Sequence, residues 1–261
     1  MNKKILLYGL MVLFLSLFLS FLIMDISIFK ISYITDKLDE SKYYDNLYSN
    51  IYNKFEETFE TLNIDGVDIN KIVDKSMIKN DIQNYITGYY KKESYILHTI
   101  EIETKLNSFI ENYNVNHKVE VDDEELVSNE VNGLLRYYEK QIKAENVLEK
   151  VSSSFMTFKG ICVPIMIISL MSIVGTYLYM IFVYNIKPLG KVFMASSALI
   201  FITQVLLQKF LSLKSLYTNE LIKESLNLIK NDVLLKFDIV CILLFIGGLI
   251  FFIFEKMFER K

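Results

Sequence analysis

The sequence predicts an all-α, polytopic membrane protein with four transmembrane helices and an extracytoplasmic helical-bundle domain between helices one and two. Three observations lead to this fold class. Four apolar stretches reach the roughly 20 residues that a helix needs to cross about 30 Å of hydrocarbon. The chain is 52% hydrophobic with a mean hydropathy of +0.30, which is high for a soluble protein. The long polar segment between the first two stretches repeats apolar residues at three- and four-residue steps, as helices do.

The first stretch, Ile5 to Met24, reads as an uncleaved signal anchor. A cleavable secretory signal has an apolar core of only about 7–15 residues followed by small residues, whereas Met24 is followed by Asp-Ile-Ser-Ile-Phe. We therefore divide the chain into transmembrane helix 1 (1–24), an acidic outer domain (25–158) and a membrane domain (159–261). Within the membrane domain we expect spans at about 161–184, 192–213 and 237–254, with Pro164 in the first turn of span two and an outer amphipathic loop at 214–236.

Positive charge sets the orientation of these spans. Lysine and arginine cluster beside the N-terminus, between spans two and three, and after span four: Lys3, Lys4, Lys187, Lys191, Lys256, Arg260 and Lys261. Such clusters mark cytoplasmic ends. We expect a multi-pass protein of the cell membrane with both termini cytoplasmic and residues 25–158 extracytoplasmic. The inverted topology is the alternative, because the 214–236 loop also carries four lysines.

The charge of the outer domain differs from that of the rest of the chain. Residues 25–158 hold 25 acidic and 15 basic side chains, which gives this segment a net charge of −10. Because the whole chain has a net charge of −3, the remaining residues have a net charge of +7. The acidic balance disfavours nucleic acid and anionic lipid as direct partners of the domain as a whole. Both cysteines, Cys162 and Cys241, lie in apolar runs, which leaves the outer domain without a disulfide framework. Abundant Ile, Lys, Asn and Tyr is typical of a low-GC Gram-positive bacterium.

The outer domain reads as a series of amphipathic helices. The first begins near Asp39 and ends at a turn over Asn63–Asp68, where Asp68 is placed to cap a short helix. Further stripes follow, and the last one starts at four consecutive acids that suit a helix N-terminus. The apolar stripes are Tyr44, Leu47, Ile51, Phe55, Phe59 and Leu62; Ile69, Ile72 and Val73; Ile78, Ile82, Tyr85, Ile86 and Tyr89; Ile102, Leu106, Phe109 and Tyr113; and Leu126, Val127, Val131, Leu134, Leu135, Tyr138 and Ile142. In the second outer loop, Ile222, Leu226, Ile229 and Val233 form another stripe, which either lies in the lipid interface or docks on the large domain.

The polar clusters of the sequence predict no catalytic, cofactor-binding or metal-ligating residue. An EF-hand register around Asp65-Gly66 would put Thr61 at position one and Ile72 at position twelve, so key carboxylates are missing. The two histidines, His98 and His117, have no ligand spacing and read as ordinary side chains. Asp122 to Glu125 reads as a solvated helix start. The sequence contains no Gly-rich phosphate loop, HExxH or GxSxG motif, and we expect no cofactor.

Inside the spans the polar residues are uncharged at mid-depth. Transporters and proton relays usually place ionisable groups there, despite a cost of a few kcal/mol each. Small and hydroxyl side chains, such as Ser169, Ser196 and Ser197, read as helix-packing residues. A polar path along Thr203, Gln204 and Gln208 of span three is the competing hypothesis.

The start of the outer domain, Leu38-Asp-Glu-Ser-Lys-Tyr-Tyr-Asp-Asn-Leu-Tyr-Ser-Asn-Ile, is followed by Ile78-Lys-Asn-Asp-Ile-Gln-Asn-Tyr-Ile. Over residues 1–90 this pattern resembles a group of membrane proteins of clostridia and related Firmicutes. The resemblance implies a signal anchor, a helical outer domain and several later spans. It implies no activity, so no functional residues are transferred from it.

The sequence favours a non-enzymatic envelope protein that binds, senses or scaffolds through its outer helical domain. Its expected partners are the lipid bilayer and another membrane or envelope protein, and not nucleic acid. A transport or channel component is the alternative, and a membrane enzyme acting on a lipid-linked substrate is the third hypothesis.

The orientation predicts a labelling pattern in intact cells. Cysteines introduced by Asp65→Cys and Asn129→Cys should react with a membrane-impermeant thiol reagent, because both positions lie in the predicted outer domain. A cysteine introduced by Leu189→Cys should react only after the cells are permeabilised, because the flanking lysines place it inside. Labelling at position 189 alone in intact cells would reverse the topology.

Overall fold

The computed structural model describes residues 3–117, 124–143, 147–185, 187–211 and 220–259. All the secondary structure in these residues is helical, and none of them forms a strand. The all-α prediction is therefore confirmed. The chain divides into two compact units, unit 1 with residues 1–34, 155–218 and 226–261, and unit 2 with residues 35–154 and 219–225.

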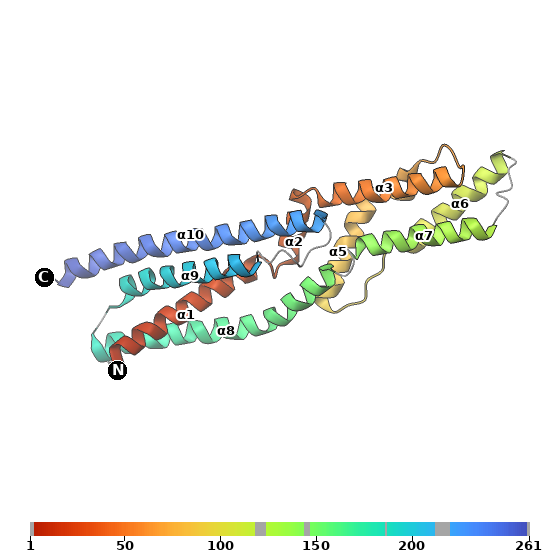
Figure 1. Ribbon diagram of the computed structural model, residues 1–261. Coiled ribbons are helices and arrows are strands. Elements are labelled where there is room, and N and C mark those ends of the chain that lie inside the picture. Colours follow the sequence, from red (N-terminus) through yellow and green to blue (C-terminus); the bar gives the residue numbers. More distant parts are fainter. Residues whose placement is uncertain (1–2, 118–123, 144–146, 186, 212–219, 260–261) are drawn as a thin grey trace. The chain divides into compact units, whose positions relative to one another are not determined.

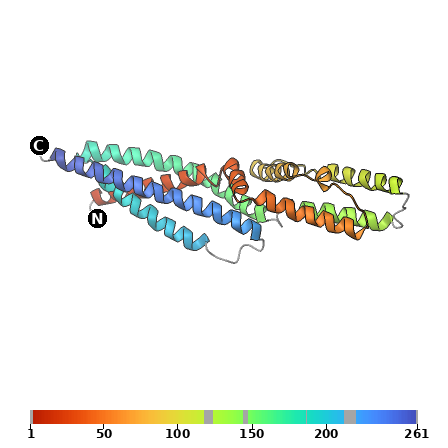
Figure 2. The same ribbon diagram turned by 90° about the horizontal axis from the view of Figure 1, so that it is seen from above.

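Unit 1 contains helices that run side by side (Figures 1 and 2). They are α1 (Lys3–Ile26), α8 (Val147–Tyr184), α9 (Leu189–Leu211) and α10 (Glu220–Glu259), of which α8 and α10 begin in unit 2. Within the described residues, the segments long and apolar enough to cross a membrane are Lys3–Ile26, Phe158–Tyr184, Leu189–Lys209 and Lys223–Met257. Each of them overlaps one of the four predicted spans, and outward side chains such as Phe182, which is 82% exposed, suit contact with lipid tails.

Two helices extend beyond their predicted spans. Because α8 begins at Val147, Pro164 lies inside the helix, so its predicted position in the first turn is wrong. The fourth span is the second half of one 40-residue helix, and the described part of the predicted 214–236 loop, from Glu220, is its first half. On that first half, Ile229 and Val233 are buried in a cluster with Ile23 of α1 and Ile200 of α9.

Helices α9 and α10 approach each other closely at two glycines. A Cβ atom at Gly248 would lie 2.8 Å from Met194 Cγ and 2.9 Å from its backbone nitrogen, and one at Gly190 would lie 2.6 Å from the backbone nitrogen of Phe252. Small residues permit this approach, which replaces the hydrophobic driving force that is missing between helices in lipid. The contact therefore depends on the absence of side chains at Gly190 and Gly248.

Serine hydroxyls join the helices of unit 1 near the same interfaces. Ser196 Oγ donates to the carbonyl oxygen of Val12 on α1 at 3.3 Å, and Ser197 Oγ donates to the carbonyl of Cys241 on α10 at 2.8 Å. Both serines are buried. These bonds agree with the helix-packing interpretation of the span serines.

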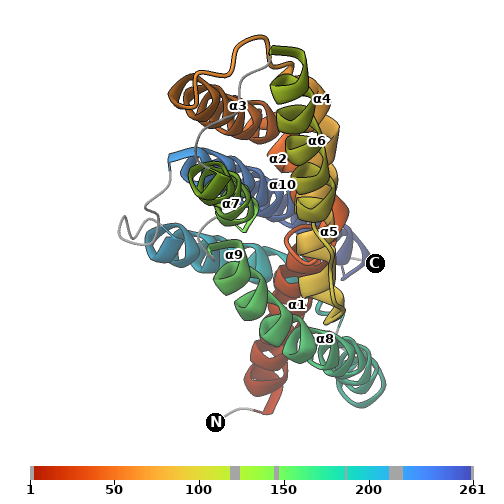
Figure 3. The ribbon, with the colours of Figure 1, turned by 90° about the vertical axis from the view of Figure 1, so that its right-hand side faces the viewer.

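Unit 2 is built from shorter helices. They are α2 (Ile31–Glu40), whose first turn belongs to unit 1, α3 (Tyr43–Thr61), α4 (Ile69–Ile72), α5 (Lys75–Lys91), α6 (Thr99–His117) and α7 (Glu124–Ile142). Helix α7 packs against α3, α5 and α6, and Figure 3 shows it beside α3 and α6. The fully buried core residues on predicted stripes include Leu47, Ile51, Phe55, Ile78, Ile82, Tyr85, Ile86, Ile102, Leu106 and Tyr138. Tyr43 is equally buried but was not part of a predicted stripe.

Local differences from the sequence prediction occur at helix ends. The helix expected from Asp39 is interrupted at Ser41 and Lys42, where Lys42 adopts a left-handed backbone (φ 55°). Asp68 does occupy the N-cap position of α4, but its side chain accepts no capping hydrogen bond. Asp74 instead caps the next helix, α5, by accepting from the Met77 backbone N–H at 2.8 Å. Asp122 and Asp123 lie outside the described residues.

The glycine contact predicts different outcomes for two neighbouring substitutions. Gly248→Ala should destabilise the spans by about 1–3 kcal/mol, because the new methyl group overlaps Met194 and forces α9 and α10 apart. Gly247→Ala is the matched control, since its Cβ would meet only Phe193 Cδ2 at 3.9 Å and alanine favours the helix. Thermal unfolding in detergent measures both variants, and equal melting temperatures would contradict the close approach.

Candidate functional site

The residues of the predicted intramembrane path have different environments on α9. Thr203 Oγ1 donates to the Leu199 carbonyl of its own helix at 3.0 Å. Gln204 is buried, and its Nε2 donates to Asp238 Oδ1 on α10 at 2.7 Å, while Gln208 is exposed. Gln204 Oε1 forms no hydrogen bond with the described residues. The structure thus joins Gln204 to Asp238 and does not join it to Thr203 or Gln208.

A second polar group joins α1, α2 and α10 in unit 1. Tyr33 Oη donates to Asp232 Oδ2 at 2.7 Å, and Lys236 Nζ lies 3.0 Å from the same carboxylate. Lys236 also donates to Ser27 Oγ at 3.1 Å and lies 4.1 Å from the centroid of the Tyr33 ring. Lys236, which was predicted to lie in an outer loop, thus helps to pack α10 against the end of α1.

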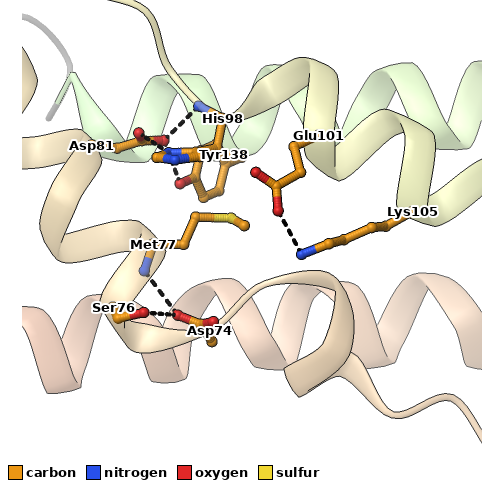
Figure 4. Close-up of polar contacts among 8 residues, drawn as sticks. All are labelled: Asp74, Ser76, Met77, Asp81, His98, Glu101, Lys105 and Tyr138. Atoms are coloured by element: carbon orange, nitrogen blue, oxygen red, sulfur yellow. Dashed lines mark hydrogen bonds and ion pairs between the residues drawn. The ribbon is translucent and has the colours of Figure 1, made fainter.

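The most distinctive side chain of unit 2 is Asp81, a carboxylate on α5 that is fully buried. Tyr138 Oη, on the last turns of α7, donates to Asp81 Oδ2 at 2.7 Å. The backbone N–H of His98, just before α6, donates to the same oxygen at 3.0 Å, and His98 Nδ1 is hydrogen-bonded to Asp81 Oδ1 (Figure 4). One carboxylate therefore joins α5, α7 and the start of α6.

This network explains how a charge is accommodated in an apolar core. Burying an ionised carboxylate costs several kcal/mol unless donors replace its lost water. In the His98 tautomer with its proton on Nδ1, Asp81 has three such donors, from two residues that are 17 and 57 positions away in the sequence. Burial, and then the bond to Asp81, raise the pKa of Tyr138 far above that of a free phenol, so its hydroxyl remains protonated and continues to donate.

The helix termini next to this network are also held by carboxylates (Figure 4). The hydrogen bonds from the Ser76 hydroxyl and the Met77 N–H hold the pKa of Asp74 below its usual value, which keeps it charged at the N-terminus of α5. In the first turn of α6, Glu101 pairs with Lys105 at 2.8 Å, and this contact lowers the pKa of Glu101. Asp74 and Glu101 thus stabilise the first turns of α5 and α6.

The chemistry available at this site centres on His98. Its side chain is 33% exposed, and with Nδ1 bound to Asp81 the other ring nitrogen, Nε2, is the one left to meet solvent or a ligand. A carboxylate that orients an imidazole in this way is found beside catalytic bases and metal ligands. Within the part of the chain that the structure describes, no three His, Cys, Asp or Glu side chains gather as a metal site.

The connection between His98 and Tyr138 was not predicted from the sequence. His98 was read as an ordinary side chain and Tyr138 as a core residue, whereas Asp81 was passed over. The sequence did indicate that Asp81 is buried, because it stands next to Ile82 and three residues after Ile78 on the apolar face of its helix. A charged residue on a buried stripe needs a partner, but the stripe does not identify it. His117 ends α6, and its side chain is outside the described set.

Comparison with protein-family models, with curated proteins and with solved structures finds no match to the chain.

The network predicts unequal effects for two adjacent tyrosines of α7. Tyr138→Phe should lower the free energy of unfolding by about 1–3 kcal/mol, because it removes one donor from a buried carboxylate and adds no cavity. Tyr137→Phe, on the partly exposed neighbouring position, should change it by less than about 0.5 kcal/mol. Chemical denaturation followed by near-UV circular dichroism compares the two, and similar losses would argue against the role assigned to the Asp81 network.

Proposed function

We propose that this protein is a non-enzymatic component of a bacterial cell envelope that binds or senses a partner through unit 2, with the four spans as its membrane anchor. The orientation that we propose places both termini in the cytoplasm and residues 25–158 outside, in a Gram-positive host. The partner class is another membrane or envelope protein. The expectation that nucleic acid is not a partner follows from the acidic balance of residues 25–158.

The observation that carries this proposal is that the Asp81 network holds helices of unit 2 together. Its three donors come from α7 and from the start of α6, so the carboxylate holds those elements to α5 instead of facing a cavity. Unit 2 also has its own apolar core, with Ile51, Phe55, Ile78 and Ile82 fully buried. Such a domain offers a preorganised surface, and preorganisation reduces the entropy that binding costs.

The transport alternative has weaker support. Gln204 is the one residue of the predicted path that is buried at a helix interface, and its Nε2 is already bonded to Asp238 and, at 3.4 Å, to the Leu234 carbonyl. These contacts also serve helix packing, in the way that polar groups join transmembrane helices.

Binding and transport can be separated by comparing a fragment with the full chain. Residues 36–152 expressed alone should be soluble, helical and cooperative in unfolding, and should capture by crosslinking the same envelope partner as the full chain. In the full chain, Thr203→Ala, Gln204→Ala and Gln208→Ala should leave that capture unchanged. The matched negative control is the fragment with Asp81→Ala, which leaves buried donors without an acceptor.

The opposite pattern would support the transport hypothesis. In that case a folded fragment captures nothing from the envelope, while the α9 substitutions abolish the cellular phenotype. The fragment lacks residues 219–225, and Ser225 of that segment shares a 2.7 Å hydrogen bond with Ser41. A second fragment with Ser41→Ala tests whether that lost contact matters for folding.

The Asp81–His98 pair favours an enzyme as the second candidate, because it resembles an oriented general base. His98→Asn separates the two functions, since the asparagine amide nitrogen can replace Nδ1 as a donor to Asp81 while Nε2 is removed. A binding protein should retain its stability and its partner with this variant. Loss of cellular function with an unchanged melting temperature would instead identify His98 as a catalytic or ligand-binding residue.

A further inference from the structure

The connection between α5 and α6 exposes apolar side chains that the rest of unit 2 buries. Among the side chains that the structure describes between residues 27 and 143, Ile96 and Ile100 are the large hydrophobic residues that are mostly exposed, at 80% and 71%. Leu97 between them is partly exposed. Single exposed apolar residues are ordinary, but a group on one short segment of an otherwise polar surface indicates a contact.

This segment, residues 92–100, comprises the connection after α5 and the first two residues of α6. It is held at both ends, and we call it the α5–α6 loop. At its start the Glu93 N–H donates to the Gly88 carbonyl at 2.9 Å, and Lys92 adopts a left-handed backbone that ends α5. Near its end the His98 N–H and ring are bonded to buried Asp81. The exposure of Ile96 therefore belongs to a fixed conformation.

An aromatic contact fixes the middle of the loop. The Tyr95 ring meets the buried Tyr85 ring edge to face, with centroids 5.0 Å apart. Gly88 permits this return of the chain, because a Cβ atom there would lie 3.0 Å from both Tyr95 Cδ1 and the Glu93 carbonyl oxygen. With Tyr95 directed inward, its neighbour Ile96 is left facing solvent.

The chemistry of the loop fits the interfacial region of a bilayer. Lys91 and Lys92 are exposed beside the apolar group, and Glu93 is the one acid among residues 91–100, so this short segment is locally basic in an acidic domain. Apolar side chains that enter the headgroup region next to lysines that reach for phosphate are the pattern of interfacial segments.

The loop is joined to the end of unit 2 from which the chain continues into a span. His98 is linked through Asp81 to Tyr138, four residues before α7 ends at Ile142. The next described helix, α8, contains the apolar span that begins at Phe158. In a protein with such spans, a bilayer is the apolar and phosphate-bearing surface available to this exposed segment.

We infer that the α5–α6 loop is a membrane-contact element: Ile96, Leu97 and Ile100 enter the interface of the bilayer in which the spans lie, and Lys91 and Lys92 meet its phosphates. Asp81 acts as a positioning residue that holds the loop in this conformation. The inference is independent of the proposed function, because the loop contacts lipid whatever partner unit 2 binds.

The absence of tryptophan from the chain makes a direct test possible. The full chain with Ile96→Trp, reconstituted in phosphatidylcholine vesicles, carries a single indole at the loop. Its emission should move to shorter wavelength, and brominated phosphatidylcholine should quench most of it. The matched control is Glu56→Trp, at an exposed position of α3, which should emit as in water and escape quenching. Ile100→Trp is the second reporter if Ile96→Trp lowers the melting temperature.

Two outcomes would overturn the inference. Water-like, unquenched emission from both loop reporters would show that the loop does not reach lipid. Emission at short wavelength that brominated lipid does not quench would show that protein covers the loop, either a second copy of the chain or another part of it.

The role of the lysines is tested in the same system. Lys91→Gln with Lys92→Asn removes both charges, and asparagine tolerates the left-handed backbone at position 92. In the Ile96→Trp background this pair should reduce quenching in an equimolar mixture of phosphatidylcholine and phosphatidylglycerol, and leave it unchanged in phosphatidylcholine alone. Equal quenching in the mixture with and without the lysines would remove them from the contact.

Discussion

A carboxylate that has lost all its water must be satisfied by the protein, and in unit 2 that requirement falls on Asp81. Its donors come from α7 and from the residue that precedes α6, so the bond network determines where two helices meet α5. Apolar stripes alone would permit several registers among these helices, because dispersion forces have little directional preference. The polar network selects one arrangement, and through His98 it also holds the loop that carries Ile96. The Asp81 network thus determines both the helix packing of unit 2 and the conformation of the α5–α6 loop, which exposes Ile96.

Unit 1 follows a different physical rule. In a bilayer, apolar surface gains little by leaving lipid for protein, so helices associate through close contact and internal hydrogen bonds. Gly190 and Gly248 let α9 and α10 meet at backbone distance, and Ser196 and Ser197 join α9 to α1 and α10. Gln204 adds a side-chain bond to Asp238. These contacts account for three of the five uncharged polar side chains on α9, which is why packing explains them more fully than a substrate path does.

The polar groups of unit 2 serve its structure. The Asp81–His98 pair has the form of a catalytic dyad, yet both oxygens of Asp81 are occupied by donors that position secondary structure. Unit 2 has its own buried core, and this supports the binding role that we propose for it. The lipid contact that we infer for the α5–α6 loop would give unit 2 a second attachment to the bilayer, and two attachments allow fewer orientations than one.

Hydropathy and helical periodicity were sufficient to predict the four spans, the all-α class and the buried stripes on α3, α5, α6 and α7, because both depend on residue spacing along a single element. Four features were decided only by tertiary structure: the break at Lys42, the interior position of Pro164, the close approach at Gly248 and the partners of Asp81. Each depends on residues far apart in the chain or on where a neighbouring helix begins. A carboxylate on an apolar stripe shows that donors are needed, but only the packing of α7 and the α5–α6 loop determines that Tyr138 and His98 supply them.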